Sequence, residues 1–410
     1  MKHIQRTVAF FLCLLLPTVT AAAKEIPVWI TDIESGEAAE TLVWEDASLW
    51  EAEETVAESA LEIGGKGSLL MELGTGQVLY EKNAHEPLPI ASVTKIMTLL
   101  LIMEAIDNGK LSYPDMLTCS ETAAGMGGSQ IWLEPGETMS VEDLLKAVTV
   151  VSANDACAVF AEHISGSVEG FVAAMNQRAA ELGMKNTKFL DSCGLNDEAY
   201  SCAYDVALMS RELMTHEDIV KYTTIWMDTL RNGDSQLVNT NKLVRHYSGA
   251  TGLKTGTTSK AGHNLAATAT RDGVSLVAVV LGCSTTKERF DGARKLLDFG
   301  FANYTTYTPT IDSAALTDVA VTHGTETSVS PTMPRITPLL MKRGEEAKIE
   351  YRVELASTIE APVTKGQQIG TLYVVKEGEI LATYPIKAKK DVSKLAFFVA
   401  FARLFRILCV

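Results

Sequence analysis

The sequence is poor in cysteine, in positive charge and in long hydrophobic runs. Seven cysteines among 410 residues are too few for a disulfide-framework protein. Lysine and arginine number 36 against 51 acidic residues, and this net charge of −15 disfavours nucleic-acid binding because phosphate would be repelled. No apolar stretch of about 18 residues is free of charge, which excludes a polytopic membrane protein. What remains, 47% hydrophobic and 21% charged residues, is typical of a globular chain of two or three domains.

The start of the chain has the pattern of a signal peptide. Lys2 and Arg6 precede an apolar stretch too short to span a bilayer, and residues 21–23 are alanines suited to cleavage. We therefore expect residues 1–23 to be removed on export. Residues 24–66 are predicted to be an acidic, disordered arm, because up to position 62 they hold 12 acids and one lysine without alternation. The six remaining cysteines are interpreted as small buried thiols.

The end of the chain, residues 389–410, is predicted to be an amphipathic helix. At 100° per residue, an apolar face forms from Phe397, Phe398, Phe401, Leu404, Phe405 and Leu408. Five cations accompany a single acid, Asp391. Such a helix is typical of an anionic membrane interface, and the alternative is docking on the chain's own core.

The middle of the chain predicts a sheet with a helical insertion, followed by a β-rich module. Gly74-Thr75-Gly76 separates two strand-like segments and indicates a hairpin. Helices are predicted over 96–105, 141–161, 168–182, 204–214 and 291–304, and strands over 68–72, 77–80, 275–281, 349–355, 371–375 and 380–386. The helix over 96–105 is apolar on all sides and is expected to be buried. Residues 307–388 alternate in strand fashion and form the small β-rich module.

Three short motifs occur in order: Ser92-Val93-Thr94-Lys95 at the head of the buried helix, Ser152-Ala153-Asn154 in a predicted helix, and Lys254-Thr255-Gly256 before a predicted strand. The three-residue spacing places the serine hydroxyl and the lysine amine on one helix face. Serine needs an adjacent base to attack a carbonyl, and Lys95 can serve when burial and a second cation, such as Lys254, favour its uncharged form. Each motif alone is weak, since a helix cap beside an exposed lysine is common. Their combination favours catalysis.

These motifs and their neighbours resemble the D-alanyl-D-alanine carboxypeptidases, the low-molecular-weight penicillin-binding proteins of peptidase family S11. The resemblance spans residues 67–306 and extends to Pro89-Ile90-Ala91 and Ala261-Gly262-His263-Asn264-Leu265. It implies an α/β (α+β) domain of the serine β-lactamase/transpeptidase type, with an antiparallel sheet flanked by helices. The β-rich module and the tail resemble the parts of carboxypeptidases that sit on the outer face of the cytoplasmic membrane.

The resemblance also implies roles for individual residues. Ser92 attacks the carbonyl between two terminal D-alanines of a peptidoglycan stem peptide, and Lys95 takes its proton. Ser152 relays a proton to the leaving D-alanine, and Asn154 orients the substrate amide. The carboxylate and oxyanion are held by Lys254, Thr255, Gly256, Thr257 and Arg289, with backbone N–H groups of Ser92 and Thr257 forming the oxyanion hole. No metal or organic cofactor is expected, and β-lactams should acylate the same serine.

Four other functions fit the sequence less well. A Ser-His-Asp hydrolase lacks its Gly-x-Ser-x-Gly elbow here, and a zinc peptidase lacks His-Glu-x-x-His. A β-lactamase would share the serine and the lysines but needs a carboxylate-held water, for which no glutamate is evident. A catalytically silent wall-binding or β-lactam-sensing protein is the remaining alternative, although it would need neither nucleophile nor base.

Overall fold

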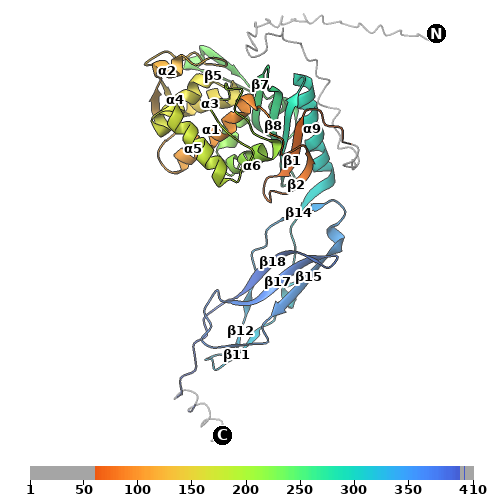
Figure 1. Cartoon of the computed structure of the whole chain (residues 1–410). Helices are drawn as coiled ribbons and strands as arrows, with labels where there is room; N and C mark the ends of the chain where they lie inside the picture. Colours follow the sequence, from red (N-terminus) through yellow and green to blue (C-terminus); the bar gives the residue numbers. More distant parts are fainter. Residues whose placement is uncertain (1–60, 398–400, 402–410) are drawn as a thin grey trace, which may run out of the picture.

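The computed structural model describes residues 61–397 and residue 401, which form a rounded α/β unit and a narrow β-rich module (Figure 1). The predicted signal peptide, the acidic arm up to residue 60 and the tail residues 398–400 and 402–410 lie outside the described residues. The helix predicted over 389–410 needs correction at its start, because Val392 and Lys394 form β-bridges with Val363 and Gly324 and Val392 is buried in the core of the β-rich module. Within the described part, no helix is both long enough and apolar enough to cross a membrane.

The α/β unit is built on a five-stranded antiparallel sheet. Its strands are β1 Gly67–Glu72, β2 Val78–Lys82, β7 Ala250–Thr258, β8 Gly262–Arg271 and β9 Val274–Cys283. They lie in the order β2-β1-β9-β8-β7, which leaves β7 at one edge. The predicted hairpin and the predicted strand over 275–281 are confirmed. Residues 61–66 already pack on this sheet, upstream of the predicted boundary at Gly67, and Ile63 is buried there.

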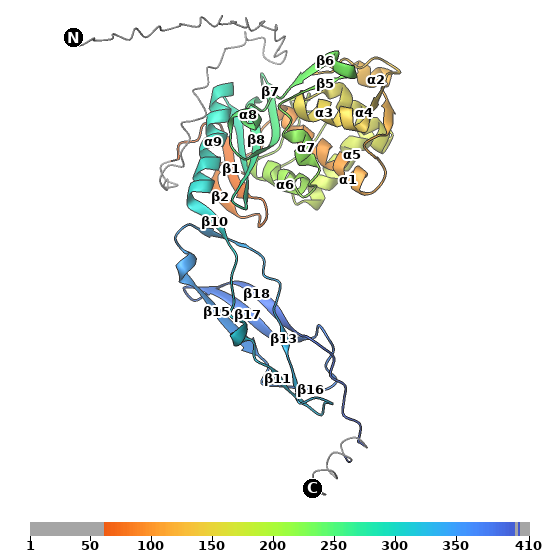
Figure 2. The same ribbon diagram turned by 180° about the vertical axis from the view of Figure 1, so that it is seen from behind.

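Helices cover both faces of the sheet (Figures 1 and 2). They are α1 Lys95–Asp107, α2 Glu121–Ala124, α3 Val141–Val150, α4 Asn154–Ser165, α5 Val168–Glu181, α6 Ala203–Leu213, α7 Ile219–Thr223, α8 Leu243–His246 and α9 Thr286–Asn303. Helix α9, the last helix of the α/β unit, packs on β8 and β9 from one side, and α6 packs on β1 and β9 from the other. The insertion also holds two hairpins, β3 Met116–Thr118 with β4 Thr138–Ser140, and β5 Met227–Leu230 with β6 Ser235–Val238.

Two helix predictions need correction. The apolar run over 141–161 is not one helix, because α3 ends at Val150 and α4 begins at Asn154. Ser152 interrupts it with a φ of +65°, a left-handed conformation that no α-helix accommodates. The helix predicted over 291–304 begins earlier, at Thr286, because the Thr285 side chain caps it by accepting a hydrogen bond from the Glu288 backbone N–H.

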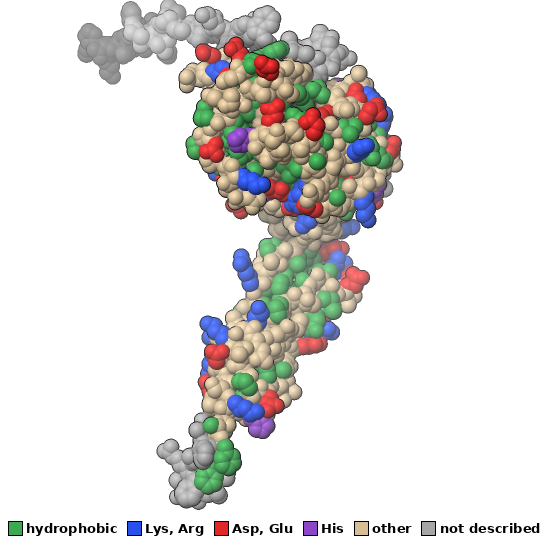
Figure 3. All heavy atoms as spheres, turned by 60° about the vertical axis from the view of Figure 1, so that its left-hand side comes forward, with side chains coloured by type: hydrophobic (Ala, Val, Ile, Leu, Met, Phe, Trp, Pro, Cys, Tyr) green, Lys and Arg blue, Asp and Glu red, His purple; other side chains and the backbone are tan. Residues whose placement is uncertain are grey.

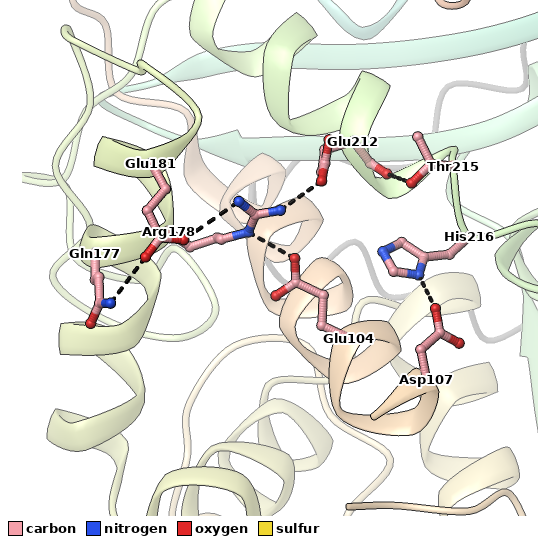
Figure 4. A network of polar contacts seen from close by, with 8 residues as sticks. All are labelled: Glu104, Asp107, Gln177, Arg178, Glu181, Glu212, Thr215 and His216. Atoms are coloured by element: carbon pink, nitrogen blue, oxygen red, sulfur yellow. Dashed lines mark hydrogen bonds and ion pairs between the residues drawn. The ribbon is translucent and has the colours of Figure 1, made fainter. Parts of the chain in front are cut away.

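Helix α1 is buried nearly all round, as predicted, and an arginine fixes its outer end. Arg178 on α5 contacts Glu104 on α1 at 2.7 Å and Glu212 on α6 at 2.6 Å (Figure 4). Asp107, the last residue of α1, accepts a further contact from His216 at 2.6 Å. These partly buried pairs tie three helices together around the element that begins at Lys95.

The β-rich module contains the strands β10 Tyr304–Tyr307, β11 Val319–Thr322, β12 Ser328–Val329, β13 Pro331–Thr332, β14 Leu339–Lys342, β15 Ile349–Leu355, β16 Thr358–Glu360, β17 Gln368–Lys376 and β18 Glu379–Ala388. Its largest sheet has the order β13-β18-β17-β15, and β10 pairs with β14 at the junction with α9. The three strands predicted here are confirmed. The module has its own apolar core, and some apolar side chains remain on its surface (Figure 3).

Candidate active site

Ser92 and Lys95 meet at the start of the buried helix. Ser92 lies in a 3-10 turn, Ala91–Thr94, that leads directly into α1 at Lys95. Lys95 Nζ donates a hydrogen bond to Ser92 Oγ at 2.9 Å and another to the backbone oxygen of Cys193 at 2.8 Å. Lys95 is fully buried, and Ser92 is 5% exposed. The lysine is therefore held against the serine in a site that largely excludes bulk water.

Strand β7 lies against the turn that carries Ser92. A β-carbon on Gly256 would lie 2.6 Å from the Ile90 carbonyl oxygen and 2.9 Å from the Ser92 amide nitrogen. No side chain fits in this space, so glycine is required for the strand to approach the turn. Lys254-Thr255-Gly256 was predicted to precede a strand, but it lies inside β7. This edge strand thus runs beside the serine, with its other edge paired to β8.

The candidate carboxylate-binding residues come from β7 and α9. Lys254 is buried and donates to the Thr255 backbone oxygen at 3.1 Å. The Thr255 hydroxyl donates to the Thr240 hydroxyl at 2.8 Å. From the other side, Arg289 donates to the Thr257 hydroxyl at 2.8 Å and is itself 6% exposed. Helix α9 therefore supplies a buried cation directly behind the end of β7.

The second motif occupies the break between α3 and α4. Ser152 is 4% exposed, and its Oγ has no hydrogen-bond partner among the described residues. Asn154 donates from Nδ2 to the Gly127 carbonyl oxygen at 2.7 Å, whereas its buried Oδ1 has no partner in the same part of the chain. Buried polar atoms are rarely left without a partner in native proteins. The Ser152 hydroxyl and the Asn154 carbonyl are therefore available to a ligand.

A buried thiol lies within electrostatic range of the lysines of the first and third motifs, on the helix that begins at the second. Cys157 lies one turn after Asn154 on α4, and both Lys95 and Lys254 act on it electrostatically. Burial raises the pKa of this thiol to about 12, and the two nearby cations lower it only in part. All five described cysteines are free and buried, as predicted: Cys119, Cys157, Cys193, Cys202 and Cys283.

Sequence reasoning missed a loop that supports Lys95. The Asp191 carboxylate accepts hydrogen bonds from the backbone N–H groups of Cys193, Gly194 and Asn196. This arrangement folds the loop so that the Cys193 carbonyl oxygen reaches Lys95 Nζ. Asp191, with Gly194 and Asn196 three and five residues later, is a turn signal that could have indicated the loop, but the long-range contact with Lys95 has no local signature.

Asp155 was also missed, and it supports the second motif. Its fully buried carboxylate accepts hydrogen bonds from the backbone N–H groups of Ile131 and Leu133 at 3.1 Å. The Asn154 backbone N–H donates to the Ser129 carbonyl oxygen at 2.7 Å. Residues 127–133 are thereby attached to the start of α4, next to Ser152. A nucleophile with an adjacent amine, unpartnered polar atoms and buried cations make this a site suited to acyl transfer.

Two protein families match successive parts of the chain. The family described as D-alanyl-D-alanine carboxypeptidase matches residues 53–285, and the penicillin-binding protein 5 C-terminal domain matches residues 304–394. The chain is 45% identical over 344 residues to the D-alanyl-D-alanine carboxypeptidase DacF of Bacillus subtilis (strain 168), which covers 83% of this chain and 88% of the relative.

Solved structures agree with the sequence comparisons. Penicillin-binding protein 5 from Haemophilus influenzae has a TM-score of 0.69 and 32% identity, covering 82% of this chain and 99% of its own. Penicillin-binding protein D2 from Listeria monocytogenes, in its ampicillin-bound form, has a TM-score of 0.52 and 33% identity, over 59% of this chain and 98% of its own. The fold class expected from the resemblance is confirmed for the sheet, the helical insertion and the β-rich module. The chain belongs to the D-alanyl-D-alanine carboxypeptidase family.

Proposed function

We propose that this protein is a serine carboxypeptidase that removes the terminal D-alanine from peptidoglycan stem peptides and so limits their cross-linking. The observation that carries the proposal is the 2.9 Å contact between the Lys95 amine and Ser92 Oγ inside a buried site. Family membership supports the substrate, because the relatives found are named D-alanyl-D-alanine carboxypeptidases.

In the acylation step, uncharged Lys95 accepts the Ser92 proton while Oγ attacks the carbonyl carbon between the two D-alanines. Backbone N–H groups of Ser92 and Thr257 stabilise the oxyanion. The proximity of β7 to the Ser92 amide, which only Gly256 permits, supports this role. The peptide C–N bond then breaks, and the proton held by Lys95 passes through the Ser152 hydroxyl to the leaving amine.

In the deacylation step, water attacks the Ser92 ester, and its proton passes to Lys95 and back to Ser92 Oγ. The products are free D-alanine and a stem peptide shortened by one residue. Every proton is carried by a side chain of this site, so the steps require no metal or organic cofactor. Asn154 Oδ1 accepts a hydrogen bond from the substrate amide N–H. This oxygen is buried and lacks a partner within the described residues.

The terminal carboxylate of the substrate is bound by Lys254 and the Thr255 hydroxyl, with Arg289 contributing its charge. Both cations are nearly fully buried, and the charge-assisted hydrogen bonds they can form there offset the cost of taking a carboxylate out of water. Arg289 acts through Thr257, to which it donates at 2.8 Å. β-Lactams carry a carboxylate and a reactive carbonyl and would acylate Ser92 in the same orientation. The ampicillin-bound form of penicillin-binding protein D2 supports this expectation.

We further propose where the enzyme acts and how it is divided. Residues 1–23 direct export, and 24–66 form the acidic arm, whose last residues, 61–66, pack on the sheet of the catalytic domain. Residues 67–306 form the catalytic domain and 307–388 form the β-rich module. Residues 389–410 anchor the protein to the outer face of the cytoplasmic membrane through the part that follows the β-bridges of Val392 and Lys394. Truncation after Ala396, which keeps the β-bridges of Val392 and Lys394, should leave D-alanine release unchanged and move the protein to the soluble fraction. Unchanged membrane association of that truncated protein would overturn the anchor.

The activity is tested with diacetyl-L-Lys-D-Ala-D-Ala as substrate. Release of D-alanine supports the carboxypeptidase. Rapid penicillin hydrolysis without D-alanine release would favour a β-lactamase. Stable penicillin acylation without release from peptides would favour a β-lactam-sensing protein.

A further inference from the structure

A cavity of about 470 Å³ opens at the end of the sheet, where β7 turns into β8. It is lined by Thr257 and Thr258 of β7, the turn up to His263, the end of β9 and Lys66 before β1. In Figure 2 this is the end of the sheet that lies farthest from the β-rich module. The cavity is large enough for a side chain of a peptide ligand.

The lining of this cavity is cationic. Its charged side chains are Lys66 and Lys260, and it contains no aspartate or glutamate, in a chain whose net charge is −15. Lys260 pairs with Glu198 at 2.5 Å. Lys66 is exposed, and its ammonium has no acidic partner among the described residues. An uncompensated cation beside a hollow favours an anionic ligand.

Two glycines form part of the cavity wall, and one of them lies under the Lys66 side chain. Gly262 and Gly282 have φ values of +66° and +69°, which favour glycine. A β-carbon on Gly282 would lie 3.0 Å from the Cγ and Cδ atoms of Lys66, so the lysine stem lies directly over this glycine. The Gly282 N–H donates to Asn264 Oδ1 at 2.7 Å, which holds the end of β9 to β8. Lys66 therefore lies on a backbone surface that a larger residue would fill.

The cavity adjoins the catalytic serine through shared residues. Thr257 lines the cavity and also accepts the hydrogen bond from Arg289 at 2.8 Å. His263, paired with Thr257 across the strands, contacts the Thr286 hydroxyl at 3.2 Å through Nδ1. Asn264 donates to the Pro89 carbonyl oxygen at 3.2 Å, three residues before Ser92. The cavity thus begins at Thr257, the residue of β7 that follows Gly256, and Gly256 itself lies against the Ser92 turn.

We propose that this cavity is a subsite for a carboxylate carried on the side chain of the residue that precedes D-Ala-D-Ala, with Lys66 as its main cation. A carboxylate is favoured over other anions because the ligand in this site is a peptide. The subsite rests on the proposed carboxypeptidase function and adds a preference for acidic stem peptides to it.

The test compares two peptides of nearly the same size that differ in this charge: Nα-acetyl-Nε-succinamoyl-L-Lys-D-Ala-D-Ala and Nα-acetyl-Nε-succinyl-L-Lys-D-Ala-D-Ala. The full-length protein should show a kcat/KM about 5-fold higher for the succinyl peptide, the size expected for one exposed ion pair. Lys66→Met should bring the ratio to about 1, and Lys66→Arg should keep it. Lys287→Met is the matched control, because Lys287 is an exposed lysine on α9 outside this cavity.

Each outcome bears on a stated claim. Equal kcat/KM values for the two peptides in the wild type would overturn the subsite while leaving the carboxypeptidase intact. A preference that Lys287→Met removes as fully as Lys66→Met would reflect general surface charge and would also overturn it. Release of D-alanine from neither peptide would overturn the proposed function itself.

Discussion

Gly194 packs so closely against Ala91 that a β-carbon at position 194 would overlap the Ala91 carbonyl oxygen. The same β-carbon would lie 2.9 Å from the Ser92 amide nitrogen. Gly194 also has a φ of +84°, which favours glycine independently of the available space. The loop that presents the Cys193 carbonyl to Lys95 is therefore seated directly on the turn of the nucleophile.

Replacing Gly194 should damage the site more than it damages the fold. Gly194→Ala must displace either the loop or the Ser92 turn, and overpacking of this kind costs about 1–3 kcal/mol. D-alanine release should fall at least about 100-fold, because misplacement near 1 Å has that effect. Gly183→Ala is the matched control, since Gly183 has a φ of +75° but nothing within 4 Å of a β-carbon. Equal losses of activity in both variants would contradict the close-packing explanation.

Ser152 has a strained backbone conformation in the candidate active site. Its φ of +65° is unfavourable for a residue with a β-carbon, and its hydroxyl has no partner within the described residues. Ser152→Gly and Ser152→Ala should both lose about 10²–10⁴-fold in D-alanine release if the hydroxyl relays a proton. Only the glycine variant relieves the strain, so it should be about 0.5–1 kcal/mol more stable than the alanine variant. Urea unfolding measures the difference, and full activity of either variant would exclude the relay.

The role of Lys95 is separated from its packing by two variants. Lys95→Met keeps a long apolar side chain but removes the base, so acylation should slow by about 10²–10⁴-fold. Lys95→Arg keeps a cation that cannot accept a proton at neutral pH and should be equally impaired. The rate of labelling by fluorescent penicillin reports this step. Retention of activity by Lys95→Arg would mean that the charge, rather than proton transfer, is what matters.

Burial of Cys157 predicts a weaker fold at alkaline pH. The pKa of its thiol is raised to about 12 in the folded protein, whereas an unfolded thiol ionises near pH 8.5. The stabilisation is complete below the unfolded value and is lost as the pH rises toward the folded value, by about 1.4 kcal/mol per pH unit. Wild-type stability should thus fall more steeply between pH 9 and 11 than that of Cys157→Ala. Parallel profiles in denaturant unfolding would show that this thiol does not ionise differently in the two states.

Local patterns predicted most of the elements because each carries its own signal. The hairpin around Gly74-Thr75-Gly76, the buried helix after Lys95 and the alternating strand β15 were predictable from turn residues and hydrophobic periodicity. The break at Ser152 was not, because the apolar run continues across it and only tertiary contacts hold the left-handed residue in place.

The candidate site was predictable only where the motifs lie. Ser92 and Lys95 are neighbours on one turn, so their contact follows from helix geometry. The support from Asp191, Cys193 and Asp155 depends on loops that meet the motifs over long sequence separations. Such contacts are set by packing of whole elements, which no local pattern encodes.

The central claim is that Ser92 carries the acyl group. The most direct measurement is D-alanine release from diacetyl-L-Lys-D-Ala-D-Ala by the wild type and by Ser92→Ala, with fluorescent penicillin labelling of the same samples. The substitution removes only the hydroxyl that contacts Lys95, so the folded protein should remain. We predict release and labelling by the wild type and neither by Ser92→Ala. Labelling or D-alanine release that persists in folded Ser92→Ala would contradict the assignment.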